Sequence, residues 1–222
     1  MTHMQLRMDR ALKNLALIPQ VPAYWENAKN ELMKRDRIMR KLIPQFGDLY
    51  LIGRDDSFTT LTRSIVAQQI SGNSANLLWQ RFLEICPSST PTQVLKIGAE
   101  KLLSCGLSKR KTEYILDLAD HFKDKRVHVD NWAVMSDEDV ISELIQIRGI
   151  GRWTAEMFLI FNLLRPNILP LDDPGLLRGI SINYFSGEPV SRSDLREVAA
   201  NWDPWRTVAT WYLWRSLDPV LL

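Results

Sequence analysis

The spacing of apolar residues predicts a chain made of helices. Apolar positions recur every three or four residues, which places them on one face of an α-helix. No stretch longer than about five residues alternates apolar and polar side chains, so strands are not expected. The predicted helices cover about residues 22–43, 57–71, 75–86, 91–97, 99–104, 109–122, 137–147, 153–161, 174–184, 191–202 and 204–217. The predicted fold class is therefore all-α.

Two of these helices meet at the turn Gly149-Ile150-Gly151. The first is amphipathic and can be capped by Ser136, and the second is apolar almost all round, so much of it should be buried. Glycines have no Cβ and let another backbone approach closely. The unpaired first N–H groups of the second helix lie at its positive end, where they can hold one phosphate. The alternative is an ordinary helix C-cap glycine followed by a tight connection.

Composition and charge narrow the class of protein. The 222 residues are 45% hydrophobic and 24% charged, as in a globular protein of one large domain or two small ones. The formal net charge of +2 creates no strong global field, so contact with nucleic acid would need a local patch. Helix 22–43 has a basic side, which we interpret as a solvated face, with nucleic-acid contact as the alternative.

The cysteines and the hydropathy exclude other classes. Cys86 and Cys105 are too few for a disulfide framework or an iron–sulfur cluster. Nothing reads as a signal peptide or a membrane span. A cytoplasmic, nucleoid-associated protein without membrane contact is the expectation.

A proline-containing loop after Phe161 leads to the sequence Asp172-Asp173-Pro174. Asp173 suits the N-cap position of the next helix, and Pro174 suits its first turn. Without the Gly-Ile-Gly turn upstream, Asp173 would be interpreted only as a residue that caps a helix.

Three motifs in order carry a resemblance that covers about residues 58–217. They are Gln68-Gln69-Ile70-Ser71, the stretch from Gly149 to Ala155 (GIGRWTA), and the stretch from Leu171 to Leu176 (LDDPGL), followed by 202–206 (WDPWR). Together they resemble the helix-hairpin-helix DNA glycosylases of the alkylated-base type. The resemblance implies two helical subdomains flanking an active-site cleft, in a compact form without the N-terminal sheet domain of the best-known member. Residues 57–172 would form the central subdomain, with the hairpin at about 137–164, and residues 1–56 with 173–222 would form the second.

The resemblance also implies the chemistry. The family places its essential aspartate at the start of the helix after the hairpin, which is Asp173 rather than Asp172, because the spacing to Leu176 and Arg178 matches. Breaking an N-glycosidic bond builds positive charge on the sugar. A carboxylate stabilises that charge and can orient or deprotonate water.

Position 153 selects between two mechanisms of this family. Bifunctional relatives carry a lysine where this chain has Trp153, and that amine attacks the sugar. Tryptophan cannot form a Schiff base, so the resemblance implies a monofunctional 3-methyladenine glycosylase II-type hydrolase without lyase activity. By the same resemblance, Trp153, Met157 and Trp214 are expected to line the pocket for the damaged base. A tryptophan at position 153 suits alkylated bases, because an electron-rich indole attracts a cationic base. The alternative for both tryptophans is ordinary core packing.

The remaining expected contacts are to duplex DNA with a damaged base, bound by a monomer. Gly149, Gly151 and Thr154 would hold the backbone. Gln69 would fill the gap left by a flipped base, or else be a surface glutamine. No cofactor or side-chain metal site is expected. The backbone carbonyls of Ile145, Ile147 and Ile150 could hold Na⁺ or K⁺.

Two other functions stay open at this stage. One is a non-catalytic helix-hairpin-helix DNA-binding protein. The other is a glycosylase of the same fold that acts on mismatched, deaminated or oxidised bases.

Overall fold

The computed structural model describes residues 21–53 and 56–217, and this part of the chain is helical with no strand. The predicted all-α fold class is therefore confirmed. None of the described helices has the length and apolar character needed to cross a bilayer. The α-helices are α2 (Trp25–Arg35), α3 (Arg37–Leu42), α4 (Ser57–Ala67), α5 (Gly72–Ile85), α6 (Pro91–Ser104), α7 (Lys109–Lys123), α8 (Asp137–Leu144), α9 (Arg152–Phe161), α10 (Pro174–Tyr184), α11 (Arg192–Ala199) and α12 (Arg206–Leu217).

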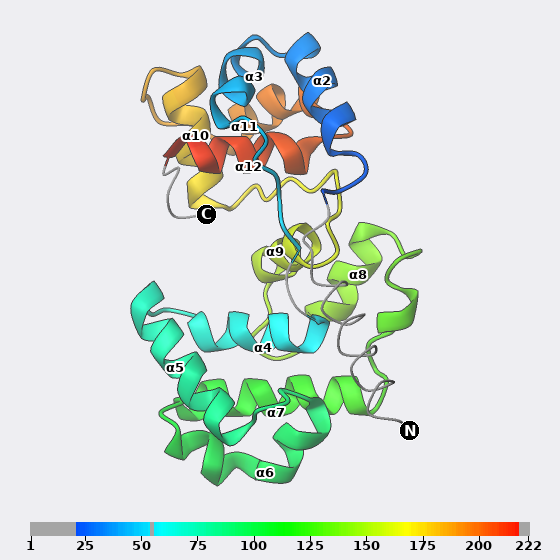
Figure 1. Ribbon diagram of the computed structural model, residues 1–222, viewed down its shortest axis with the longest axis vertical. Coiled ribbons are helices and arrows are strands. Elements are labelled where there is room, and N and C mark those ends of the chain that lie inside the picture. Colours follow the sequence, from blue (N-terminus) through cyan, green and yellow to red (C-terminus); the bar gives the residue numbers. More distant parts are fainter. Residues whose placement is uncertain (1–20, 54–55, 218–222) are drawn as a thin grey trace, which may run out of the picture.

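The helices pack in two groups with α9 between them (Figure 1). In one group, α4 packs on α5 and α7, and α6 packs on α5 and α7. In the other, α12 packs on α2, α3 and α10, so this group is built from both ends of the described chain. The predicted division into subdomains 57–172 and 1–56 with 173–222 stays a prediction, and residues 1–20, 54–55 and 218–222 lie outside the described residues.

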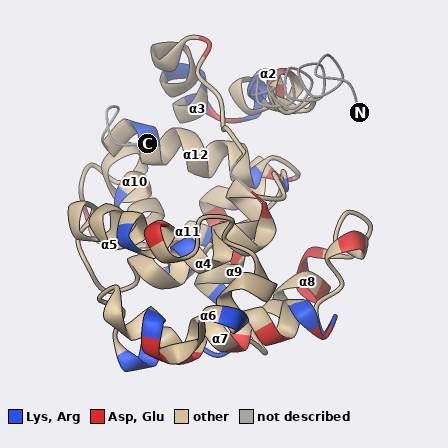
Figure 2. Cartoon of the chain, turned by 60° about the horizontal axis from the view of Figure 1, so that its bottom comes forward, with Lys and Arg blue, Asp and Glu red and all other residues tan. Residues whose placement is uncertain are grey.

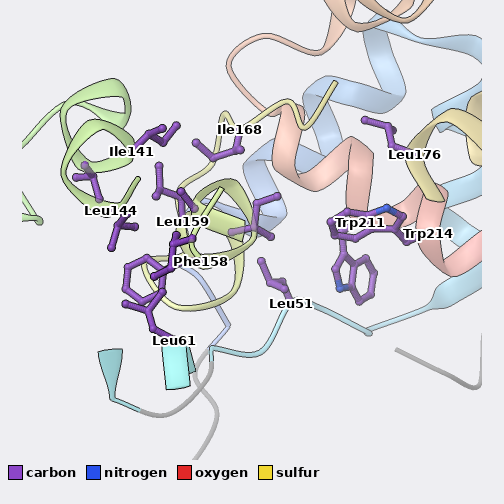
Figure 3. Close-up of a cluster of buried hydrophobic side chains, with 14 of the residues drawn as sticks. Leu51, Leu61, Ile141, Leu144, Phe158, Leu159, Ile168, Leu176, Trp211 and Trp214 are labelled. Carbon is purple, nitrogen blue, oxygen red and sulfur yellow. The ribbon is translucent and has the colours of Figure 1, made fainter. Parts of the chain in front are cut away.

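One hydrophobic core runs through both groups by way of α9 (Figure 3). Phe158 and Leu159 of α9 are buried and lie near Leu144 of α8 and Leu61 of α4. Trp214 of α12, on the other side, belongs to the same cluster. Burial on several sides explains why α9 is apolar almost all round.

Side-chain caps set most of the helix starts. Ser136 accepts a hydrogen bond from the Asp139 N–H at 3.1 Å and caps α8, as predicted. Ser191 and Asp194 form a reciprocal capping box at α11. Each cap satisfies backbone donors that the first helical turn leaves unpaired.

The prediction of a single helix over residues 22–43 is wrong. The chain breaks at Asp36, which has extended backbone angles and ends α2 while capping α3. One carboxylate oxygen accepts from the N–H groups of Ile38 and Met39, at 2.8 and 3.0 Å. The other accepts from the Tyr184 hydroxyl at 2.7 Å and the Trp202 indole at 3.0 Å. These buried partners hold a break that the apolar spacing did not reveal.

Smaller differences also have local causes. α4 ends at Ala67 and α5 already begins at Gly72, because the Ser71 side chain caps it. The predicted helices 91–97 and 99–104 are the two halves of α6, which kinks at Gly98 (φ 72°). The final helix begins at Arg206 rather than Pro204, which follows a cis peptide bond.

Replacing Asp36 with alanine should lower the free energy of unfolding by about 1–3 kcal/mol. The change removes the α3 cap and leaves the half-buried hydroxyl of Tyr184 and the buried indole N–H of Trp202 without their acceptor. Chemical denaturation measures the loss. Asp194→Ala is the matched control, because it removes a capping carboxylate whose partner, Ser191, is exposed, and it should cost less. Equal losses for the two variants would contradict a structural role of the buried partners.

Candidate active site

A cleft of about 990 Å³ opens between the two helical groups. Its size is at the upper end of the range of about 300–1,000 Å³ that is typical of small-molecule sites. The cleft gathers six of the predicted site residues from the hairpin, α9, the start of α10 and α12, and Gln69 from the loop after α4. Its lining comprises Arg63, Ser64, Ala67, Gln68, Gln69, Arg110, Tyr114, Gly149, Trp153, Thr154, Met157, Phe161, Asp173, Gly175, Trp214 and Leu217.

Asp173 is the one carboxylate among the residues that line this cleft. It is 6% exposed and caps α10, with Oδ1 accepting from the Leu176 N–H at 2.6 Å. The Trp214 indole N–H also donates to Oδ1, at 2.7 Å, and the Trp153 indole N–H donates to Oδ2 at 2.9 Å. Three donors on one buried carboxyl satisfy both of its oxygens and fix its direction.

Asp172 occupies a different environment. It is exposed and forms an ion pair with Arg192. The two adjacent aspartates therefore differ in burial, and only Asp173 lines the cleft. This placement agrees with the choice of Asp173 made from the motif spacing, while its catalytic role stays a prediction.

The aromatic side chains form the wall of the cleft beside Asp173. Trp214 is 8% exposed and stacks on Phe161, with ring centroids 5.7 Å apart and an interplanar angle of 12°. Trp153 is 45% exposed, so its indole is not a core side chain. Met157 lies one helical turn after Trp153 on α9 and lines the same wall. The wall is thus apolar and electron-rich, with Asp173 as its charged group.

The two hairpin glycines have different local roles. Gly149 has a φ of 86°, and a Cβ there would lie 2.1 Å from the Tyr114 ring. Only glycine fits this position without a rearrangement. Gly151 is the N-cap of α9, with a φ of −91°, and a Cβ there would meet open space. Gly149 therefore belongs to the packing of the hairpin, whereas Gly151 has open space beside it and is not among the residues that line the cleft.

Neighbouring elements hold the hairpin in place. The Gln68 amide donates to the Gly149 carbonyl at 2.8 Å, which ties the end of α4 to the turn. The Arg148 N–H donates to the Asp117 carboxylate of α7 at 2.8 Å. Gln69 follows in a left-handed conformation (φ 57°) and is exposed at the cleft. The loop that carries the predicted wedge is thus fixed to the hairpin.

Arg152, the first residue of α9, is engaged in ion pairs. Arg152 pairs with Glu138 of α8 and with Glu156 of α9. Burial raises the pKa of the Glu156 carboxyl, and Arg152 opposes that rise. Because its charge is shared by two carboxylates, Arg152 adds little free positive charge to the hairpin.

The structure leaves the predicted monovalent-cation site untested. The Ile147 carbonyl accepts a hydrogen bond from the Ile150 N–H at 3.0 Å. Within residues 21–53 and 56–217, no group of three histidine, cysteine, aspartate or glutamate side chains is arranged to hold a metal.

The sequence reasoning missed several residues that line the cleft, among them Gly175, Phe161, Tyr114, Arg63 and Arg110. Gly175 has a local signal, since it follows the Asp-Pro pair, and a Cβ there would lie 3.1 Å from Asp173 Oδ1. Phe161, Tyr114, Arg63 and Arg110 have none. They reach the cleft only because α4, α7 and α9 are folded together.

Comparisons with known proteins agree with this arrangement. The chain is 31% identical over 183 residues to DNA-3-methyladenine glycosylase 1 of Schizosaccharomyces pombe, covering 79% of each chain. Among solved structures it is similar to a DNA-3-methyladenine glycosidase from Bacillus halodurans, with a TM-score of 0.79, 33% identity, and 86% and 88% of the two chains covered.

A second solved structure is the S. pombe 3-methyladenine DNA glycosylase in complex with abasic DNA. Its TM-score is 0.75 at 27% identity, with 86% of this chain and 96% of that chain covered. Residues 62–204 match the profile of the HhH-GPD superfamily of base excision DNA repair proteins. This match spans more than half of the 222 residues, and the chain therefore belongs to the HhH-GPD superfamily.

Proposed function

We propose that this protein is a monofunctional DNA glycosylase that hydrolyses the N-glycosidic bond of alkylated bases in duplex DNA. The observation that carries the proposal is the buried carboxylate of Asp173, oriented by three donors in the cleft beside the hairpin. Relatives named as 3-methyladenine DNA glycosylases support the same assignment.

The reaction follows from the positions of these groups. A base inside a duplex is out of reach, so the nucleotide must leave the stack and enter the cleft. The wall of Trp153, Met157 and Trp214 would receive the base, and a cationic alkylated base is attracted to indole faces. Asp173 would stabilise the positive charge that develops on the sugar and orient the attacking water.

The hairpin would hold the DNA backbone near the lesion. Gly151 leaves space beside the first N–H groups of α9, and Thr154 lies in the first turn of the same helix. Contacts of backbone N–H groups to phosphate carry no sequence information, so they suit an enzyme that acts at any position. We place Gln69 in the gap left by the flipped base.

Base release from duplexes with single lesions tests the proposal directly. Single-turnover assays should compare 3-methyladenine, 7-methylguanine, hypoxanthine and ethenoadenine with mismatched and oxidised bases. Release of alkylated bases supports the proposal. A DNA shift without release of any base would indicate a non-catalytic binding protein, and release of only oxidised or mismatched bases would overturn the substrate class.

Trp153→Lys should create no lyase activity. A lysine attacks the sugar only when its amine reaches the sugar carbon and its pKa is lowered, and this cleft is lined at position 153 by an indole instead. Borohydride reduction during turnover measures this, because it traps a Schiff base between enzyme and DNA. The wild-type protein should give no adduct either, and trapping in the wild type would refute the monofunctional mechanism.

A further inference from the structure

Most positive charge near the hairpin is already neutralised within the protein. Arg148 pairs with Asp117, and Arg152 pairs with Glu138 and Glu156. Figure 2 shows acidic and basic residues interspersed along the helices, in keeping with the net charge of +2. A polyanion bound at this cleft therefore needs cations from another part of its lining.

Arg63 of α4 and Arg110 of α7 are the two arginines that line the cleft. Both side chains are exposed. Neither forms a salt bridge within the described part of the chain. Each has one amide partner. Arg63 donates to the Asn76 side chain at 3.4 Å, and Arg110 donates to Gln69 Oε1 at 3.1 Å.

These amide contacts leave most of each guanidinium free. A guanidinium has five N–H donors, and these two hydrogen bonds use one nitrogen of each side chain. Its planar shape fits two phosphate oxygens at once. An amide oxygen orients such a group without neutralising it, which keeps the full charge available to a ligand.

We propose that Arg63 and Arg110 form a second backbone-binding site, separate from the hairpin, for DNA phosphates beside the flipped nucleotide. The inference rests on the proposed function, because it takes DNA to be the ligand of this cleft. The two arginines stand on α4 and α7, which pack on each other, whereas Asp173 stands on α10. Their charge would also offset the repulsion between phosphates and the Asp173 carboxylate.

The test is the salt dependence of binding to a duplex that carries a single stable abasic-site analogue. This probe requires no catalysis, so its result is independent of base release. Arg63→Met and Arg110→Met should each weaken binding by about tenfold and lower the slope of log K against log salt by about one. The weakening should be equal on undamaged duplexes, because phosphate contacts read no sequence.

Three controls make the result specific. Arg81→Met removes an exposed arginine of α5 that does not line the cleft, and it should change neither affinity nor slope. Arg63→Lys and Arg110→Lys keep the charge and should keep the slope. Thermal unfolding of every variant verifies that the fold is intact.

A double-variant cycle separates a direct phosphate contact from an effect through Gln69. If Arg110 contacts phosphate, Arg110→Met should lower the slope equally in the Gln69→Ala background. Loss of the effect in that background would overturn the assignment of Arg110. Unchanged slopes for both methionine variants, in a protein that still binds and releases bases, would overturn the whole second site and leave the proposed function standing.

Discussion

Asp173→Asn is expected to slow base release by about 10²- to 10⁴-fold, the usual effect of losing one well-placed electrostatic or acid–base group. Asparagine keeps the oxygen that caps α10, so the protein should stay folded. The variant lacks the negative charge needed under the sugar. Its amide nitrogen, in place of Oδ2, would also face the Trp153 N–H, donor against donor.

The size of the loss should depend on the base. Bases that are already cationic are better leaving groups and need less help, so they should lose the least activity. Affinity for duplex DNA should persist or increase, because a carboxylate near phosphates has been removed. Single-turnover rates on a cationic and a neutral lesion, with affinities measured alongside, provide the comparison.

Asp172→Asn is the matched control, since it makes the same chemical change one residue away. Asp172 is exposed and pairs with Arg192, so its loss should have a small effect. If Asp172→Asn were the more damaging change while both proteins remained folded, the assignment of the catalytic carboxylate would be wrong.

Gly149→Ala should lower the free energy of unfolding by about 3–5 kcal/mol. The left-handed backbone (φ 86°) costs about 1–2 kcal/mol for a residue with a Cβ. The overlap with the Tyr114 ring adds an overpacking cost, because the nearest ring atom would be 2.1 Å away. Chemical denaturation measures the sum of the two costs.

Two further variants separate these causes. Gly151→Ala should leave stability nearly unchanged, because its Cβ meets open space, while it weakens binding to all DNA sequences about equally. In a Tyr114→Ala background, Gly149→Ala should cost less, since only the backbone strain remains. A change of lesion preference at unchanged overall affinity in Gly151→Ala would contradict its position at a backbone contact.

The features that could be predicted from the sequence depend on neighbouring residues. The Gly149–Gly151 turn, the Ser136 cap and the Asp173 cap each lie within a few positions of the helices they define. The break at Asp36 could not be predicted in this way. Its partners Tyr184 and Trp202 are 148 and 166 positions away, and apolar spacing within one helix contains no information about them.

The residues of the candidate site likewise fall into those that local motifs predict and those that only tertiary packing brings to the cleft. Asp173 and Trp153 were found through motifs, and their hydrogen bond joins residues only 20 positions apart. Arg63, Arg110 and Tyr114 lie in ordinary amphipathic helices, where nothing local distinguishes a cleft residue from a solvated one. Only the packing of α4 and α7 beside the hairpin brings them to the cleft.

The partners that cover α2 have a consequence for the order of events during synthesis. Trp25 packs edge-on against Trp211, with ring centroids 5.2 Å apart. The Asp36 carboxylate accepts a hydrogen bond from the Trp202 indole. A ribosome makes α2 and α3 before the residues that bury them. Until α12 emerges, the nascent chain exposes the apolar side of α2 to chaperones and to other chains, so α2 reaches its native environment only after α12 has been made.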